Sequence, residues 1–166
     1  HNFAAWAAAR ATQRGFTTTE NLKNVLESSG IQRFIERPCG QAKFGGQHRK
    51  WCRSICTELS AVGVGNATYG RAATLVAVYL KSMVVLLNPS SEEAAYIHPP
   101  VDRILLQNIA RDADTGPERS QMLRGTSWTK LGETEYFDLI SALSDINGDR
   151  PFWKLEEYWD VTPGSS

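Results

Sequence analysis

The chain has 166 residues, 42% of them hydrophobic, which suits one domain with a single buried core. No apolar run reaches the ~20 residues that a membrane-spanning helix needs, so we expect no membrane contact and, by default, a soluble cytoplasmic protein. Three cysteines are too few for a disulfide framework, and the sequence offers no convincing set of zinc ligands around them. We therefore expect neither a metal nor another cofactor.

The net charge is zero, but the two halves of the chain differ in charge. Residues 1–83 contain eleven Lys or Arg and four Asp or Glu, whereas residues 84–166 contain seven and fourteen. A chain polarised in this way can present a basic face to phosphates, which favours a nucleic acid as the partner. The alternatives are accidental patterning, or two halves that attract each other.

The first part of the chain is expected to form short helices. Apolar residues at helical spacing predict helices over residues 2–14 and 20–29. A shorter helical piece over residues 31–36 ends before Pro38, because the residue that precedes a proline is pushed out of helical geometry. Residues 38–46 carry three glycines and are expected to form a basic, aromatic loop.

A glycine-containing turn is predicted between two longer helices. An apolar residue at every fourth position from Trp51 to Leu59 predicts a helix over residues 47–61. Residues 68–87 are apolar nearly all round, which predicts the buried central helix. Arg71, close to the turn, is a candidate phosphate contact. The turn contains the residues that we expect to direct free amide groups at solvent: Gly63, Val64 and Gly65.

A single carboxylate follows a polar connector and a Pro-Pro step. Residues 88–96 form the connector, and Pro99 and Pro100 forbid helix up to that point. Asp102 therefore falls at or near the first turn of a helix predicted over residues 101–113. Considered alone, such an aspartate is most simply a helix N-cap, whose replacement by alanine costs about 1 kcal/mol.

The last part of the chain is predicted to contain two more helices. Residues 112–126 have no clear period and are expected to be irregular. Inward-facing apolar residues predict a helix over residues 134–146 and a final one over residues 152–159. No strand pattern occurs, so the fold is predicted to be an all-α, single-domain helical bundle over residues 1–166.

The order of helix, V-G-V-G turn, apolar helix, loop and P-P-V-D resembles the helix-hairpin-helix base-excision DNA glycosylases, especially their compact archaeal-type 8-oxoguanine branch. The helix-hairpin-helix motif would span about residues 47–87, and the helix that carries the catalytic Asp would begin at about residue 101. In that family the hairpin amides grip a DNA phosphate, and the Asp after the second helix is catalytic. The resemblance implies the phosphate role for Gly63, Val64 and Gly65 and the catalytic role for Asp102.

One position departs from the resemblance. Family members that also cut the strand carry a lysine just inside the second helix, where this chain has Ala72, Ala73 and Thr74. Lys81 lies about two turns further along roughly the same face, from which it either reaches the site or, as we expect, sits deeper or on a flank. We therefore expect a monofunctional enzyme that leaves an abasic site. Further candidates for the pocket or an accessory role are Thr74, Lys81, His48 and Trp128.

The expected function is excision of a modified base from double-stranded DNA by a monomeric enzyme, in repair or in defence against phage. A carboxylate can stabilise an oxocarbenium-like sugar and activate water, and the flipped base can be held against aromatic side chains. The resemblance suggests oxidised guanine or glucosylated hydroxymethylcytosine as the base. Two alternatives remain: a non-enzymatic helix-hairpin-helix DNA-binding module, and an all-α interaction protein whose V-G-V-G turn is only a loop.

Overall fold

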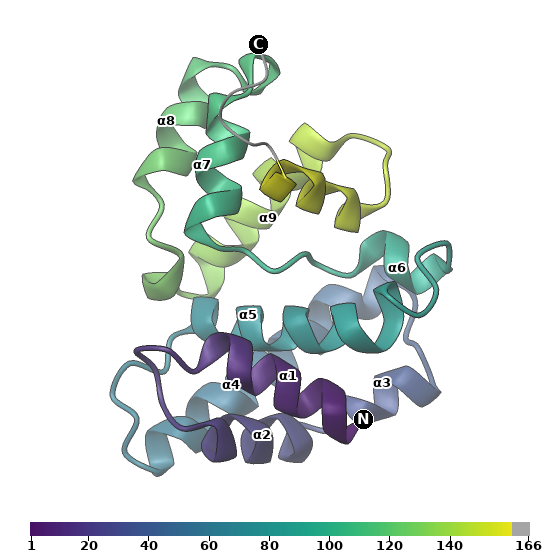
Figure 1. Ribbon diagram of the computed structural model, residues 1–166, viewed down its shortest axis with the longest axis vertical. Helices are drawn as coiled ribbons and strands as arrows, with labels where there is room; N and C mark the ends of the chain where they lie inside the picture. Colours follow the sequence, from purple (N-terminus) through teal and green to yellow (C-terminus); the bar gives the residue numbers. More distant parts are fainter. Residues whose placement is uncertain (161–166) are drawn as a thin grey trace.

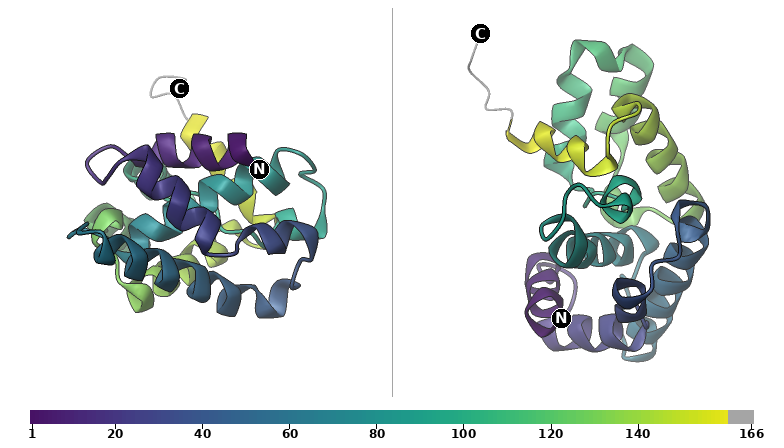
Figure 2. Two further views of the ribbon diagram at one scale, coloured as in Figure 1. Left: turned by 90° about the horizontal axis from the view of Figure 1, so that it is seen from below. Right: turned by 90° about the vertical axis from the view of Figure 1, so that its right-hand side faces the viewer.

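The computed structural model describes residues 1–160, which fold as one all-helical domain with no strand in that range (Figure 1). The helices form two layers joined by α6 (Glu92–Tyr96), as the side view also shows (Figure 2). The first layer contains α1 (Asn2–Thr12), α2 (Thr19–Ser28), α3 (Gln32–Glu36), α4 (Gln41–Ala61) and α5 (Tyr69–Leu80). The second layer contains α7 (Arg103–Arg111), α8 (Pro117–Gly125), α9 (Glu133–Asn147) and the 3-10 segment η4 (Phe152–Asp160). The prediction of an all-α fold is confirmed.

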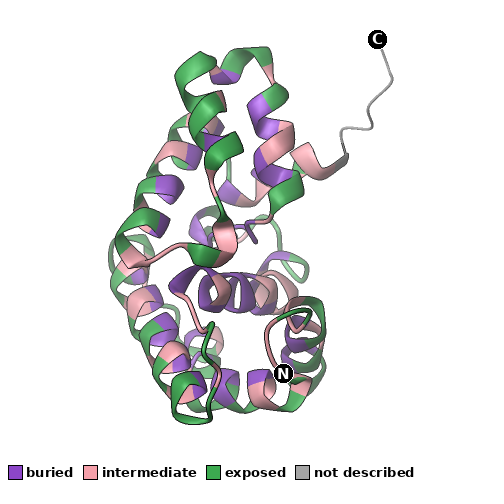
Figure 3. Ribbon diagram, turned by 90° about the vertical axis from the view of Figure 1, so that its left-hand side faces the viewer, coloured by how far each residue is buried: buried purple, intermediate pink, exposed green. Residues whose placement is uncertain are grey.

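The central helix of the domain is α5. Nearly all of its residues are buried, and α1 and α4 pack against it (Figure 3). Its first turn also approaches the short 3-10 segment η3 (Trp128–Lys130) closely, since a Cβ added at Gly70 would lie 2.1 Å from the carbonyl oxygen of Trp128. Only a glycine permits this approach, which brings the start of α5 against the second layer.

The two layers differ in charge, because the basic half of the chain contains the first layer and the acidic half contains the second. Part of it is neutralised at their junction, where Arg49 and Arg53 of α4 both pair with Glu133 at the start of α9. Lys81, just after α5, pairs with Glu156 of η4. The structure therefore bears out, for these three basic residues, the alternative in which the two halves attract each other.

Several helix boundaries differ from those predicted. The expected loop over residues 38–46 is wrong for most of its length, because α4 begins at Gln41. Phe44 is only 3% exposed and its ring lies 5.7 Å from that of Phe34 and 6.1 Å from that of Trp51. This packing outweighs the weak helix propensity of Gly45 and Gly46.

Two short helices lie where irregular structure was expected. The polar connector contains α6, and the segment over residues 112–126 contains α8. Gly116 at φ +80° and Pro117 in the first helical turn mark the start of α8. The predicted second helix of the hairpin is also shorter, because regular α-helix ends at Leu80 and the π-helical segment η1 (Lys81–Val85) follows.

Candidate active site

Asp102 caps the N-terminus of α7. Its backbone is extended, as is usual for an N-cap residue, and its Oδ1 accepts a hydrogen bond of 2.7 Å from the backbone amide of Leu105. The same oxygen accepts a hydrogen bond of 3.2 Å from the indole Nε1 of Trp159. The side chain is half-buried, and Oδ2 has no hydrogen-bond partner among residues 1–160. One carboxylate oxygen thus accepts two hydrogen bonds, whereas the other accepts none from the described residues.

Trp159 connects Asp102 to Lys81. The Lys81 Nζ lies 4.7 Å from the centre of the Trp159 ring and forms an ion pair with Glu156. Burial raises the pKa of the Glu156 carboxyl above its ordinary value, although the Lys81 ammonium acts in the opposite direction. A cavity of about 470 Å³ lies beside this group, and its walls include Lys81, Trp153, Glu156 and Trp159.

Thr74 links the central helix α5 to the residue that precedes Asp102. Its buried hydroxyl contacts two carbonyl oxygens, that of Gly70 at 3.1 Å and that of Val101 at 3.3 Å. The second contact ties α5 to the residue that precedes Asp102. Thr74 lines none of the described cavities, so its place in the site is that of a structural link rather than a pocket wall.

The glycine turn between α4 and α5 differs in detail from the expected one. Gly63 has a φ of +86°, whereas Gly65 has no positive φ. The amides of Gly63 and Val64 donate to the carbonyls of Ser60 and Leu59, both at 3.0 Å, and so close the end of α4. We had expected these two amides to be free to bind a phosphate, and that prediction is wrong. Among the described residues, the amide of Gly65 has no protein acceptor.

Arg71 and Trp128 flank the start of α5. The Arg71 guanidinium lies 4.8 Å from the centre of the Phe16 ring and is half-buried. Trp128 belongs to η3, to which α5 is tied by a hydrogen bond of 2.6 Å from the Thr68 hydroxyl to the carbonyl of Thr129. A cavity of about 360 Å³ is lined by Trp128 together with Arg103 and Arg124. Trp128 therefore does line a pocket, with basic neighbours.

His48 lies in the core rather than in a cavity. It is 1% exposed, its Nδ1 lies 2.9 Å from the hydroxyl of Tyr69, and its ring stacks on that of Tyr136. The neighbouring His98 lies 3.1 Å from the Tyr136 hydroxyl. Burial lowers the pKa of His48 well below its ordinary value and that of His98 to about 3, so both rings are neutral. The interpretation of His48 as a pocket residue is not supported.

Two residues of the site were missed by sequence reasoning. Trp159 and Glu156 lie in the last predicted helix, where Trp159 was assigned to packing and Glu156 received no role. The sequence does contain a signal, because a tryptophan and an acid three residues apart on one short segment can approach one site together. Their contacts with Asp102 and Lys81 nevertheless span 57 and 75 residues of sequence.

Comparison with protein-family models, with curated proteins and with solved structures found no match to this chain. Within residues 1–160, no cluster of three or more His, Cys, Asp or Glu is arranged to hold a metal ion. The helices of the same range include none that combines the length and the apolar character needed to cross a membrane.

Proposed function

We propose that the chain is a DNA glycosylase that hydrolyses the N-glycosidic bond of a flipped, modified base. The observation that carries the proposal is the environment of Asp102, whose Oδ1 is held by the Leu105 amide and the Trp159 indole. Trp159 also lines the cavity that contains Lys81. Asp102 lines none of the described cavities itself, and it is linked to this one through the Trp159 indole. The reaction needs a fixed carboxylate close to an aromatic-walled cavity.

The chemistry assigned to Asp102 follows from its two oxygens. Cleavage of the glycosidic bond builds positive charge on the sugar, which a nearby carboxylate stabilises. The same carboxylate can orient a water molecule for attack at the sugar carbon and accept its proton. Oδ2 is the atom assigned to these tasks, since Oδ1 already accepts two hydrogen bonds.

The base is proposed to enter the cavity beside Trp159. Its volume of about 470 Å³ lies in the range of ligand sites, and two of its walls are the indoles of Trp153 and Trp159. Aromatic walls suit a base that has been removed from the helical stack. Candidate bases are oxidised guanine and glucosylated hydroxymethylcytosine.

DNA is proposed to lie along the start of α5. The Gly65 amide, which has no acceptor among the described residues, is assigned to a backbone phosphate, and Arg71 lies close by on the first turn of α5. Arg103 and Arg124, which line the neighbouring cavity, extend the basic surface toward the N-terminus of α7. The partner is therefore double-stranded DNA with one nucleotide extruded toward Asp102.

Lys81 is assigned an electrostatic role and not that of a nucleophile. Its Nζ pairs with Glu156 and lies over the Trp159 ring, so these two contacts hold it away from attack on the sugar. The reaction proposed is accordingly hydrolysis that leaves an abasic site with the strand intact.

A second candidate is a DNA-binding module without activity. The hydrogen bond of 2.7 Å between Asp102 and Leu105 favours it, because that bond alone gives Asp102 a structural role as a cap. This candidate predicts DNA binding that does not depend on Asp102 and no release of any base.

The test compares Asp102→Asn with the wild-type protein on duplexes that carry candidate modified bases, with freed bases measured by mass spectrometry. Asparagine keeps an oxygen for both the Leu105 amide and the Trp159 indole and is an equally good N-cap, so stability should change little. Base release should fall by at least about 100-fold, the lower range for removal of a general base.

Asp112→Asn is the matched control. Asp112 is also a half-buried capping carboxylate, and it accepts a hydrogen bond of 2.7 Å from the hydroxyl of Tyr158, next to Trp159 in η4. It should retain full activity. Normal turnover by a folded Asp102→Asn protein, or no base release by the wild type while DNA is bound, would exclude the glycosylase and leave the binding module.

A further inference from the structure

The largest of the described cavities lies at the junction of the two layers. It has a volume of about 670 Å³ and is bounded by the first turns of α4, by α6, by one face of α9 and by the loop over residues 148–151. This volume lies within the range of small-molecule sites. The cavity shares no lining residue with the one beside Trp159, and Asp102 does not line it.

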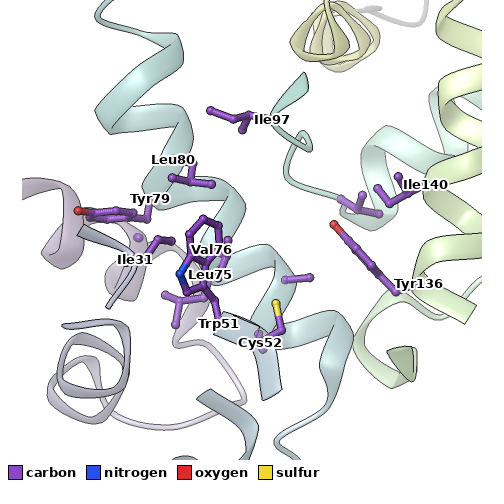
Figure 4. Close-up of a cluster of buried hydrophobic side chains, with 14 of the residues drawn as sticks. Ile31, Trp51, Cys52, Leu75, Val76, Tyr79, Leu80, Ile97, Tyr136 and Ile140 are labelled. Atoms are coloured by element: carbon purple, nitrogen blue, oxygen red, sulfur yellow. The ribbon is translucent and has the colours of Figure 1, made fainter. Parts of the chain in front are cut away.

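His98 supplies an open nitrogen to this cavity. Its side chain is 8% exposed, and its Nδ1 lies 3.1 Å from the hydroxyl of Tyr136. Figure 4 shows Tyr136 and Ile140 together on α9, with the Tyr136 hydroxyl directed toward the segment that follows Ile97. The Nε2 of His98 has no hydrogen-bond partner among the described residues, yet it is not one of the two unpartnered atoms there that are sealed from solvent. Because His98 lines the cavity, its Nε2 is open to a molecule inside it.

Three phenylalanine rings surround the His98 imidazole. The ring centres of Phe44, Phe137 and Phe152 lie 5.1, 5.9 and 5.8 Å from that of His98, and all three side chains line the cavity. Such a floor suits a flat aromatic ring. In either tautomer of the neutral imidazole, Nε2 is one donor or one acceptor, so a hydrocarbon would leave it unpaired. A heteroaromatic ring that carries donors and acceptors along one edge satisfies both tautomers.

The rim of the cavity carries one uncompensated carboxylate. Asp145 pairs with Arg119, and Arg150 pairs with Glu157. Asp149 lines the same rim and forms no ion pair within residues 1–160. A carboxylate accepts hydrogen bonds from an amino group and repels an anion. The rim therefore favours a ligand that has an amino group and lacks a phosphate.

The loop that contains Asp149 is held in shape by Asn147. Asn147 is buried, and its Nδ2 donates to the carbonyl oxygens of Arg150 at 2.6 Å and Pro151 at 3.3 Å. Gly148 begins the loop with a φ of +65°, which favours glycine. The rim is thus formed before a ligand arrives, which lowers the entropy cost of binding.

We propose that this cavity binds an amino-substituted heteroaromatic molecule without a phosphate, namely a free purine base or its nucleoside. The flat ring lies against the phenylalanine floor, a polar atom of the ring meets the Nε2 of His98, and the amino group donates to the carboxylate of Asp149. The lining comes from both layers, so the bound molecule joins them and stabilises the fold. The proposal does not rest on base excision, because it needs neither DNA nor Asp102.

The test titrates the full chain, labelled with ¹⁵N at histidine, with adenine and with adenosine, and follows the ring nitrogen resonances. The resonances of His98 are assigned from His98→Gln. Both ligands should shift the Nε2 resonance of His98 by more than any resonance of His48, which does not line the cavity. In calorimetric titrations, purine, which lacks the amino group, should bind about threefold to tenfold more weakly than adenine, the range for one hydrogen bond.

Asp149→Ala should weaken adenine binding by the same factor, and its position on an exposed loop lets this variant fold even where His98→Gln does not. Asp138→Ala is the matched control, because Asp138 is an exposed aspartate of α9 that lines none of the described cavities. It should bind adenine as the wild type does. Three outcomes would overturn the proposal: an unmoved His98 resonance, equal binding of purine and adenine, or equal loss of binding in the two aspartate variants.

Discussion

The indole Nε1 of Trp159 donates a hydrogen bond of 3.2 Å to Oδ1 of Asp102, across 57 residues of sequence. The bond connects η4 to the first turn of α7, at the point where the Asp102 carboxylate also caps that helix. Trp159 thereby orients the carboxylate. The Lys81 Nζ lies over the ring of the same tryptophan. A substitution of this tryptophan should therefore change the hydrogen bonding of Asp102 directly.

Trp159→Phe should lower base release by about 10- to 100-fold, because a hydrogen bond to a charged group contributes about 1.5–3 kcal/mol. The measurement is the single-turnover rate of base excision with duplex in excess of its dissociation constant. Trp153→Phe is the control, since that indole lines the same cavity but donates to the backbone carbonyl of Pro89 at 3.1 Å. Equal loss in both variants would mean that Trp159 acts through the cavity wall and not through Asp102.

Borohydride treatment during turnover should trap no covalent adduct between the wild-type protein and DNA. The Nζ of Lys81 is engaged in the ion pair with Glu156, so it is not positioned to attack the sugar. Lys81→Ala should therefore keep base release within about tenfold of the wild type, and gel analysis should show intact strands. An adduct in the wild type that is lost in Lys81→Ala would identify Lys81 as a nucleophile and contradict the hydrolytic route.

The free energy of unfolding should fall as the pH is lowered below about 6.5, the ordinary pKa of histidine. The pKa values of His48 and His98 are lowered in the folded protein, the latter to about 3, so the unfolded chain binds more protons in this window. Each histidine contributes a slope that approaches about 1.4 kcal/mol per pH unit. Urea unfolding between pH 7.5 and 5 measures the slope, which His98→Gln should reduce. An unchanged slope in that variant would contradict the assignment.

Gly70→Ala should destabilise the fold by about 1–3 kcal/mol, the usual cost of overpacking. The added Cβ would lie 2.1 Å from the Trp128 carbonyl oxygen and 3.1 Å from the Leu131 Cβ, so α5 must move away from η3. Gly65→Ala is the control, because a Cβ there meets nothing within 4 Å and its φ is not positive. Thermal melts distinguish the two variants. Equal melting temperatures would show that η3 can move away from α5 without lowering the free energy of unfolding.

Local sequence patterns were sufficient for the helical class and for most of the helices. The apolar residues of α5 predicted a buried central helix, and Pro99 and Pro100 placed Asp102 at a helix start, because proline restricts its own backbone and that of the residue before it. Helices with weak periodicity were missed: α8 has few apolar residues, and the glycines in the first turns of α4 suggested a loop.

The sequence by itself determined that Asp102 opens a helix after a rigid proline step, since capping and proline geometry act over only a few residues. Only the tertiary structure decided what surrounds that carboxylate. Trp159, Glu156 and Lys81 come from distant segments, and their contacts depend on how the two layers pack, which no local pattern encodes. The same holds for His48, which the packing of α4 against α9 buries in the core although its local sequence is polar and basic.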